Sequence, residues 1–238
     1  MQGQFARTER LVGKDGMERL YRARVAVFGV GGVGGYTVEA LVRSGIGTLD
    51  LIDPDTVSLT NLNRQIFALQ STLGRRKVDA AKERIADINP QAVVNTYSVF
   101  YMPATSGQFD FREYDYIVDA IDTVTGKIAL AEQAQAAGTP IISSMGAGNK
   151  MDPAAFMVAD LYETSVCPLA KVMRRELKKR GIKNLKVVYS REVPRKPAVI
   201  DPPGGADSQR NIVPASNAFV PAAAGFIMAG EVVNDLLR

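Results

Sequence analysis

Short apolar runs and helically spaced apolar positions alternate along the first 150 residues. Residues 25–28 form an apolar run typical of a strand that is buried on both faces of a parallel sheet. From 77 to 88, apolar side chains recur every three or four positions until Asn89-Pro90, which predicts a helix. The same reasoning predicts strands ending near 53, 99, 119 and 142, and helices over 34–43 and 125–137. We therefore expect an α/β fold with a Rossmann-like, mostly parallel sheet and flanking helices, essentially complete by residue 142.

The pattern changes after residue 151. It predicts an added strand within 154–162, a basic helix over 168–180, a strand over 186–189, a mobile loop over 194–216 that is rich in Pro, Gly and Ser, and a closing helix over 221–237. A chain of 238 residues with this alternation favours one domain. We expect a single domain over 1–238, with a nucleotide-binding core over 1–150 and a C-terminal extension over 151–238.

A glycine-rich loop directly follows the strand at residues 25–28. Glycines permit a tight turn and close backbone approach to phosphate, and the amides that begin the next helix carry partial positive charge. An anionic ligand is therefore expected at this loop. The next strand ends at Asp53, whose carboxylate could accept hydrogen bonds from ribose hydroxyls, as in dinucleotide-binding folds. The loop glycines are Gly29, Gly31, Gly32 and Gly34.

Further polar side chains are predicted near the carboxyl ends of the strands, where open α/β sheets bind ligands. Asp55 provides turn and cap chemistry after Asp53, and Asn61 and Arg64 follow in the same segment. Lys77 lies in the first turn of a helix, where it is either a solvated charge or faces an anion. Asp122 falls at another strand's carboxyl end.

Composition excludes some chemistry. The chain has no histidine and one cysteine, Cys167, so it can form neither an intrachain disulfide nor a zinc site of the usual Cys/His kind. Histidine acid–base catalysis is also excluded. Cys167 precedes Pro168 at a predicted helix start, where the dipole would lower a thiol pKa. It is either a nucleophile or, as is more common for a lone cysteine, a small buried apolar residue.

Charge is concentrated in one segment. Residues 171–196 contain 11 Lys/Arg and 2 Asp/Glu, whereas the whole chain has a net charge of only +4. Such a segment suits a polyanion such as a nucleic acid, although charged helix faces are often simply solvated. The candidate residues for binding a nucleic acid are Lys171, Arg174, Arg175, Lys178 and Lys179.

The amino-terminal residues are polar, and no run of 18 apolar residues occurs. We therefore expect no secretory signal, no stable membrane insertion and a cytoplasmic location.

Taken together, the glycine loop, Asp53, SLTNLNRQ (58–65), Lys77 and DAIDTV (119–124) resemble the adenylyltransferases related to ubiquitin-activating enzymes. The resemblance implies that ATP binds at the glycine loop and Asp53. It also implies that Asn61, Arg64 and Lys77 surround the phosphates and that Asp122 holds Mg²⁺. By the same resemblance, the chain forms a homodimer in which Arg10 reaches the partner's active site.

The later segments DLYETSVCPLAKVMRRELKKRG (160–181) and SNAFVPAAAGFIMAGEVVNDLL (216–237) look like those of the tRNA threonylcarbamoyladenosine dehydratases. This likeness extends over nearly the whole chain. It implies ATP-dependent adenylation of the threonylcarbamoyl carboxylate on a tRNA adenosine, followed by cyclisation with loss of water. A sulfur-transfer protein is a candidate partner.

Other functions stay open at this point. An adenylyltransferase for a ubiquitin-like sulfur carrier is the nearest rival, although such enzymes usually carry two CxxC pairs that this chain lacks. An NAD-binding oxidoreductase or a non-catalytic nucleotide sensor would also use the glycine loop and Asp53. Arg64, Lys77 and Asp122 argue against both.

Overall fold

A computed structural model describes residues 3–198 and 214–238. Within them, the helices are α1 (Ala6–Arg22), α2 (Gly34–Ser44), α3 (Lys77–Ile88), α4 (Val124–Ala137), α5 (Pro168–Lys179) and α6 (Val220–Leu237). The strands are β1 (Arg24–Phe28), β2 (Thr48–Ile52), β3 (Val93–Tyr97), β4 (Tyr116–Asp119), β5 (Ile141–Ser144), β6 (Phe156–Asp160) and β7 (Lys186–Ser190). Most of the loop expected over 194–216 lies outside the described residues.

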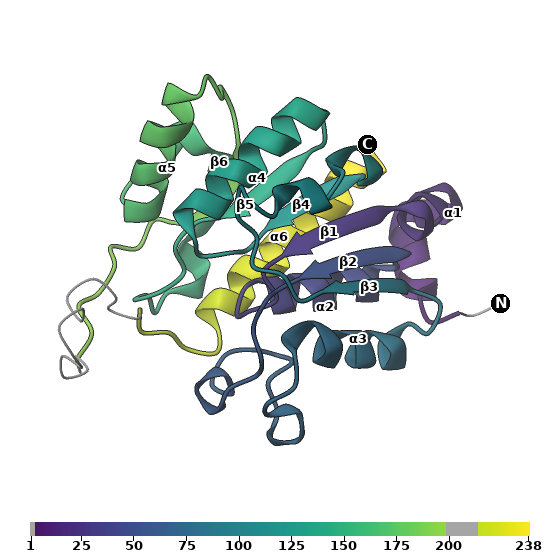
Figure 1. Cartoon of the computed structure of the whole chain (residues 1–238). Coiled ribbons are helices and arrows are strands. Elements are labelled where there is room, and N and C mark those ends of the chain that lie inside the picture. Colours follow the sequence, from purple (N-terminus) through teal and green to yellow (C-terminus); the bar gives the residue numbers. More distant parts are fainter. Residues whose placement is uncertain (1–2, 199–213) are drawn as a thin grey trace.

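The strands form one sheet in the order β3-β2-β1-β4-β5-β7-β6 (Figure 1). All neighbouring strands are parallel except β6, which is antiparallel to β7. The predicted α/β fold with a mostly parallel sheet is confirmed.

The expectation that the parallel sheet is complete by residue 142 was wrong. β7 pairs in parallel with β5, with Ser143 opposite Val187, and β6 forms the edge. Between β5 and β7 the chain no longer alternates regularly between strand and helix patterns. Local sequence pattern therefore could not identify the strand that pairs with β7.

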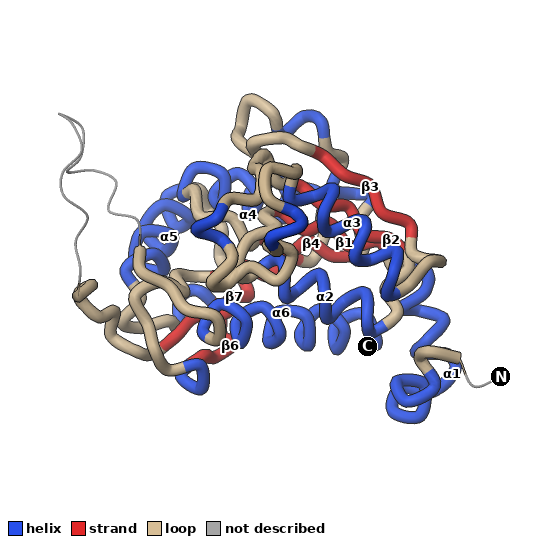
Figure 2. Tube along the Cα trace, turned by 90° about the horizontal axis from the view of Figure 1, so that it is seen from below, coloured by secondary structure: helices blue, strands red, loops and turns tan. Residues whose placement is uncertain are grey.

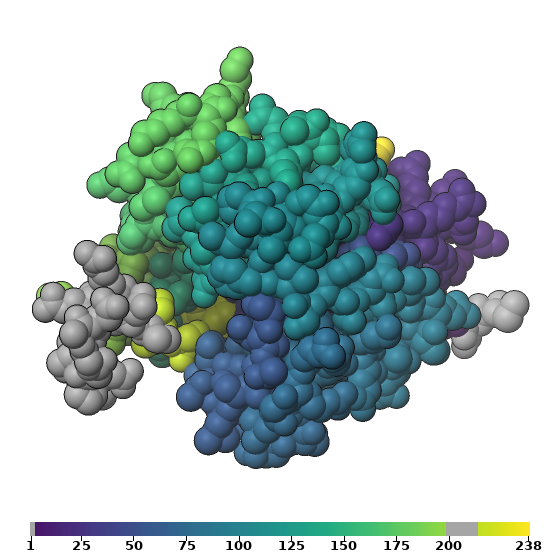
Figure 3. Space-filling view, in the orientation of Figure 1, coloured from purple at the N-terminus to yellow at the C-terminus, as the bar shows by residue number. Residues whose placement is uncertain are grey.

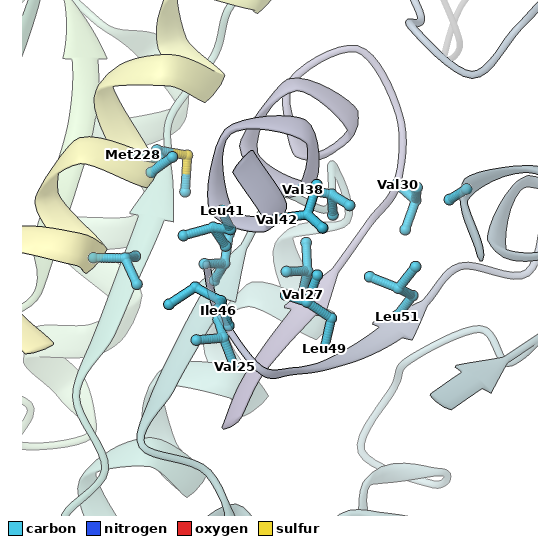
Figure 4. Packing of buried hydrophobic residues seen from close by; sticks show 14 of the residues in the cluster. Val25, Val27, Val30, Val38, Leu41, Val42, Ile46, Leu49, Leu51 and Met228 are labelled. Atoms are coloured by element: carbon cyan, nitrogen blue, oxygen red, sulfur yellow. The ribbon is translucent and has the colours of Figure 1, made fainter. Parts of the chain in front are cut away.

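Helices cover both faces of the sheet, and successive residues of β1 point to opposite sides. Val25 and Val27 belong to one core cluster with residues of α2, α3 and α6. Figure 4 shows them with labelled residues of α2 and α6. Ala26 and Phe28 pack instead with residues of α4 and with several aromatic side chains from the segment between β3 and β4. Because both faces are buried, β1 is apolar throughout its buried length.

α6 lies beside α2 under the sheet (Figure 2). It is the one described helix with the length and composition of a membrane span, but 44% of it is buried inside the protein. Met228 and Val232 belong to the main core. This packing is that of a core helix.

Candidate active site

The glycine loop joins β1 to α2 in a turn that leaves almost no room for side chains. Gly29 has φ +89°, and a Cβ at this position would lie 2.7 Å from the carbonyl oxygen of Ala120. A Cβ at Gly34 would lie 1.8 Å from the carbonyl oxygen of Gly29. The turn therefore requires glycine at both positions. Gly31 and Gly32 line the pocket above the loop.

Asp53 lies at the carboxyl end of β2 and is nearly fully buried. Its carboxylate accepts hydrogen bonds from the backbone amides of Val30 (2.7 Å) and Asp55 (2.9 Å). Burial raises the pKa of Asp53, although Lys77 and the two amides act in the opposite direction. Asp53 therefore ties the glycine loop to β2 while still bordering the pocket.

Lys77 begins α3 and is buried rather than solvated. Its Nζ donates to Asp55 Oδ2 at 2.6 Å and lies 3.7 Å from Asp53 Oδ1. Because it also lines the pocket, this ammonium group faces the space where an anion would enter.

The segment after β2 places Asn61 and Arg64 in the pocket lining. Asn61 is buried, and its Oδ1 accepts from the amide of Ser58 at 3.1 Å. The Arg64 guanidinium donates to the carbonyl of Thr60 at 2.8 Å and to Asn63 Oδ1 at 2.9 Å. Arg64 thus presents a cation whose position is set by local contacts.

Asp122 follows β4, is exposed and borders the pocket. Its Oδ1 accepts from the Thr123 hydroxyl at 3.4 Å. Within 3–198 and 214–238, no group of three or more Asp, Glu, His or Cys side chains could hold a metal ion. A single carboxylate does fit Mg²⁺ in a nucleotide site, because phosphate oxygens and water supply its other ligands.

Apart from Gly34, which shapes the turn without lining the cavity, these residues line one pocket of about 380 Å³ at the carboxyl ends of the strands. The blue, teal and yellow segments that contribute its walls meet on one face of the molecule (Figure 3). Sequence reasoning missed several wall residues. Position after β2, β3, β4 or β5 was the available signal for most of them, whereas those at or before the start of α6 had none. The missed wall residues are Gln65, Val99, Phe100, Tyr101, Ile121, Thr123, Ala147, Gly148, Pro214, Ser216 and Pro221.

Arg10 is exposed on α1 and is not among the described residues that line this pocket. Within one chain, the structure therefore does not bring Arg10 to the other candidate residues.

The basic helix α5 has one buried face and one charged face. Lys171, Arg175, Lys178 and Lys179 are exposed, whereas Arg174 is half-buried and donates to the Thr164 carbonyl at 2.9 Å. Glu176 pairs with Arg175 at 3.0 Å and with Lys179 at 3.3 Å. Four of the five candidate cations are thus on the surface, and Arg174 also has a structural contact.

Cys167 is the N-cap residue of α5 and is buried in an apolar cluster with Met173 and Leu177. It is not one of the described residues lining the pocket. Its surroundings are those of a small apolar side chain.

Comparison with known proteins agrees with this geometry. The ThiF family model matches residues 5–237. The chain is 47% identical to a tRNA threonylcarbamoyladenosine dehydratase of Bacillus subtilis, covering 99% of this chain and 95% of that protein. It superposes with a TM-score of 0.88 and 33% identity on the Escherichia coli enzyme of that name, TcdA, in complex with ATP, covering 98% of this chain and 93% of that one.

A more distant relative has a different role. The adenylyltransferase and sulfurtransferase UBA4 of Candida glabrata is 33% identical, but the match covers 57% of this chain and 31% of that protein. The matches over nearly full length and the pocket lead to one conclusion: the chain belongs to the ThiF family.

Proposed function

We propose that this protein is an ATP-dependent tRNA threonylcarbamoyladenosine dehydratase. The observation that carries the proposal is the 47% identity, over nearly the whole chain, to a relative with that name. The pocket supports it, because the glycine loop, Asp53 and Lys77 are brought together as an ATP site requires. We also propose that residues 1–238 form one domain, since β7 and α6 complete the sheet and core begun by the first 150 residues.

In this proposal ATP lies across the carboxyl ends of the strands. Its phosphates meet the amides after Gly29, and Asp53 accepts hydrogen bonds from the ribose hydroxyls. Asn61, Arg64 and Lys77 face the phosphates. When Lys77 binds a phosphate oxygen, its contact with the exposed Asp55 is partly exchanged for a stronger charge-assisted one. Mg²⁺ held by Asp122 would neutralise negative charge on the phosphates.

The first chemical step is adenylation. A carboxylate oxygen of the threonylcarbamoyl group attacks the α-phosphorus, a phosphorus–oxygen bond forms, and the bond to pyrophosphate breaks. Negative charge develops on the departing pyrophosphate, so Arg64 and Lys77 are placed to stabilise it. The carboxylate thereby becomes an acyl adenylate.

Ring closure follows within the same side chain. A nucleophilic atom of that side chain attacks the activated carbonyl carbon, and AMP leaves with the original carboxylate oxygen. The product has therefore lost one water relative to the substrate. Because nucleophile and carbonyl are already joined, the reaction gains effective molarity and needs neither a histidine base nor a cysteine relay. This agrees with the burial of Cys167 away from the pocket.

We propose that the enzyme is a homodimer, with Arg10 acting in the partner's site. The support is the exposure of large apolar side chains on α1 and α6: Leu11 is 87% exposed and Phe226 is 51% exposed. Contact with a second protein surface would bury such side chains. Arg10 is adjacent to Leu11, so a partner docked there would lie next to this guanidinium group.

We further propose that the exposed cations of α5 bind the tRNA backbone. The test variant reverses the charges at Lys171, Arg175, Lys178 and Lys179. The control is Lys82→Glu, at an exposed position of α3. Arg174 is left unchanged because it supports Thr164. The quadruple variant should lose affinity for tRNA, with a salt dependence that falls by about one unit per lost phosphate contact. ATP affinity should stay unchanged; equal salt slopes for all proteins would refute the assignment.

A pyrophosphate-release assay separates the rival functions. With ATP and Mg²⁺, release should require tRNA that carries threonylcarbamoyladenosine. Stimulation by a ubiquitin-like sulfur carrier instead would favour the carrier adenylyltransferase, and tight NAD binding would favour an oxidoreductase. ATP binding without turnover would indicate a nucleotide sensor. We expect the enzyme to act in the cytoplasm and retain a sulfur-transfer protein as a candidate partner.

A further inference from the structure

Three polar side chains lie almost completely out of contact with solvent beneath the candidate active site. Asp119 and Lys127 are each 1% exposed, and Ser143 is 0% exposed. Lys127 Nζ donates to Asp119 Oδ1 at 3.0 Å, and the Ser143 hydroxyl donates to Asp119 Oδ2 at 2.5 Å. Lys127 Nζ is also 3.3 Å from Ser143 Oγ. We call these three residues the buried triad.

The buried triad joins three elements at one point. Asp119 is the last residue of β4, Ser143 is near the end of β5, and Lys127 is in the first turns of α4. Between Asp119 and Lys127 the chain passes through Asp122. The triad therefore fixes both the strand that leads into the Asp122 turn and the helix that leaves it.

This turn is in direct contact with the glycine loop. The Asp119 carboxylate also accepts from the amide of Ile121 at 3.3 Å, which shapes the turn locally. The amide of Ala120 donates to the carbonyl of Phe28 at 2.8 Å, and the Ala120 carbonyl occupies the space next to Gly29. A displacement of Asp119 would thus be transmitted both to Asp122 and to the loop expected to hold the phosphates.

Stability alone does not account for a fully buried ion pair at this position. Removing two charges from water is costly, and well-packed apolar side chains of similar volume often serve a fold equally well. The paired charges do specify geometry, because each carboxylate oxygen has its own donor and the ammonium group has two acceptors.

From this arrangement we infer that the buried triad positions Asp122 against the glycine loop, so that Asp122 and the loop can serve one bound nucleotide together. Lys127 is a positioning residue, since it is not among the described pocket-lining residues and acts through Asp119 and the turn. The inference rests on the proposed function of Asp122. A misplacement of about 1 Å at a reacting centre can lower a rate roughly 100-fold, so a change beneath the pocket can affect turnover strongly.

The test uses the full-length protein and the double variant Lys127→Met/Asp119→Asn, which removes both charges and nearly preserves volume. The expected result is a folded protein that needs at least a tenfold higher Mg²⁺ concentration for tight ATP binding. Titration calorimetry with ATP and Mg²⁺ measures this without tRNA. Hydrogen exchange of the Ile121 and Asp122 amides should accelerate at least tenfold.

Glu39→Gln is the matched control. Glu39 is also buried and accepts from Arg84 at 2.7 Å, but it links α2 to α3. This variant removes a buried charge without touching the Asp122 turn, so its Mg²⁺ requirement and its exchange at Asp122 should match those of the wild type. A change equal to that of the double variant would show a general loss of stability and overturn the inference.

Ser143→Ala provides an independent, milder test if the double variant does not fold. It removes one donor to Asp119 and should shift the Mg²⁺ requirement in the same direction by a smaller factor. A wild-type Mg²⁺ requirement and wild-type exchange at Asp122 in whichever variant folds would overturn the inference. The readouts do not depend on dehydration, so a wild-type protein that failed to modify tRNA would reject the proposed function separately.

Discussion

Two alanine substitutions in the glycine loop should separate folding from nucleotide binding. At Gly34, a new Cβ would lie 1.8 Å from the Gly29 carbonyl oxygen, 1.2 Å short of the 3.0 Å that Cβ contacts essentially always keep. The obstructing atom belongs to the backbone of Gly29. This backbone is held in place, because the Gly29 amide donates a hydrogen bond to the Ile52 carbonyl at 2.8 Å. At Gly31, the nearest atom is Gln65 Nε2 at 3.8 Å, which is an ordinary contact.

The expected magnitudes differ accordingly. Overpacking typically costs about 1–3 kcal/mol, and a rigid obstruction places Gly34→Ala at the upper end, about 3 kcal/mol. For a chain of this size that corresponds to a fall of roughly 6–12 °C in Tm. Gly31→Ala should keep the wild-type Tm. Its methyl group borders the pocket where phosphate approaches the backbone, so ATP affinity should fall about 10- to 100-fold, or roughly 1.4–2.8 kcal/mol.

Thermal unfolding and calorimetric titration with ATP and Mg²⁺ measure the two effects on the same samples. Wild-type stability in Gly34→Ala would contradict the close approach of the loop to itself. Wild-type ATP affinity in a folded Gly31→Ala protein would show that the phosphates do not lie over this amide, and would remove the main physical support for the ATP site.

Four further substitutions test individual roles. Asp122→Asn should keep the fold and lower turnover about 100- to 1,000-fold, because it removes the carboxylate expected to hold Mg²⁺, whose positive charge would stabilise the developing negative charge; turnover within a few-fold of wild type would refute this role. Arg10→Ala and Lys77→Ala chains, each inactive alone, should regain about one quarter of wild-type sites after mixing, since half the dimers are mixed and each has one intact site; verified exchange without recovery would exclude action in trans. Cys167→Ser should lower Tm modestly, because it buries a hydroxyl group, while dehydration persists; a folded, ATP-binding but inactive variant would indicate a covalent mechanism.

Local sequence pattern was sufficient for the elements that build the nucleotide site. β1, the glycine loop and β2 follow one another over 30 residues, and each has a distinct signature in hydrophobicity or glycine content. The closing helix predicted over 221–237 is observed as α6 over Val220–Leu237. Its apolar composition reflects burial against α2 and the sheet.

Features that depend on tertiary contacts were not predictable in this way. Lys127 is a cation in a helix, which by sequence resembles a solvated residue, and only the approach of Asp119 and Ser143 reveals its burial. Arg174 was grouped with the exposed cations of α5, but it contacts the Thr164 carbonyl from a loop ten residues earlier. The chain reversals that bring such groups together leave no local pattern.

The pocket wall near the start of α6 illustrates the same limit. Asn149 accepts from the amide of Ala215 at 2.8 Å and Asn63 donates to the carbonyl of Ser216 at 3.2 Å, so segments separated by 66 and 153 residues share this wall. Neither contact follows from periodicity or composition. Ser216 lines the pocket, as do the neighbouring residues Pro214 and Gly148.

Removal of water from threonylcarbamoyladenosine in tRNA, driven by ATP, can be observed on the nucleoside itself. The most direct measurement is mass spectrometry of nucleosides from such tRNA after incubation with the purified protein, ATP and Mg²⁺, with Asp122→Asn as the matched control. We expect the threonylcarbamoyladenosine signal to be replaced by one lighter by the mass of a single water, in step with release of AMP and pyrophosphate. An unchanged nucleoside in the presence of active, ATP-binding protein would contradict it.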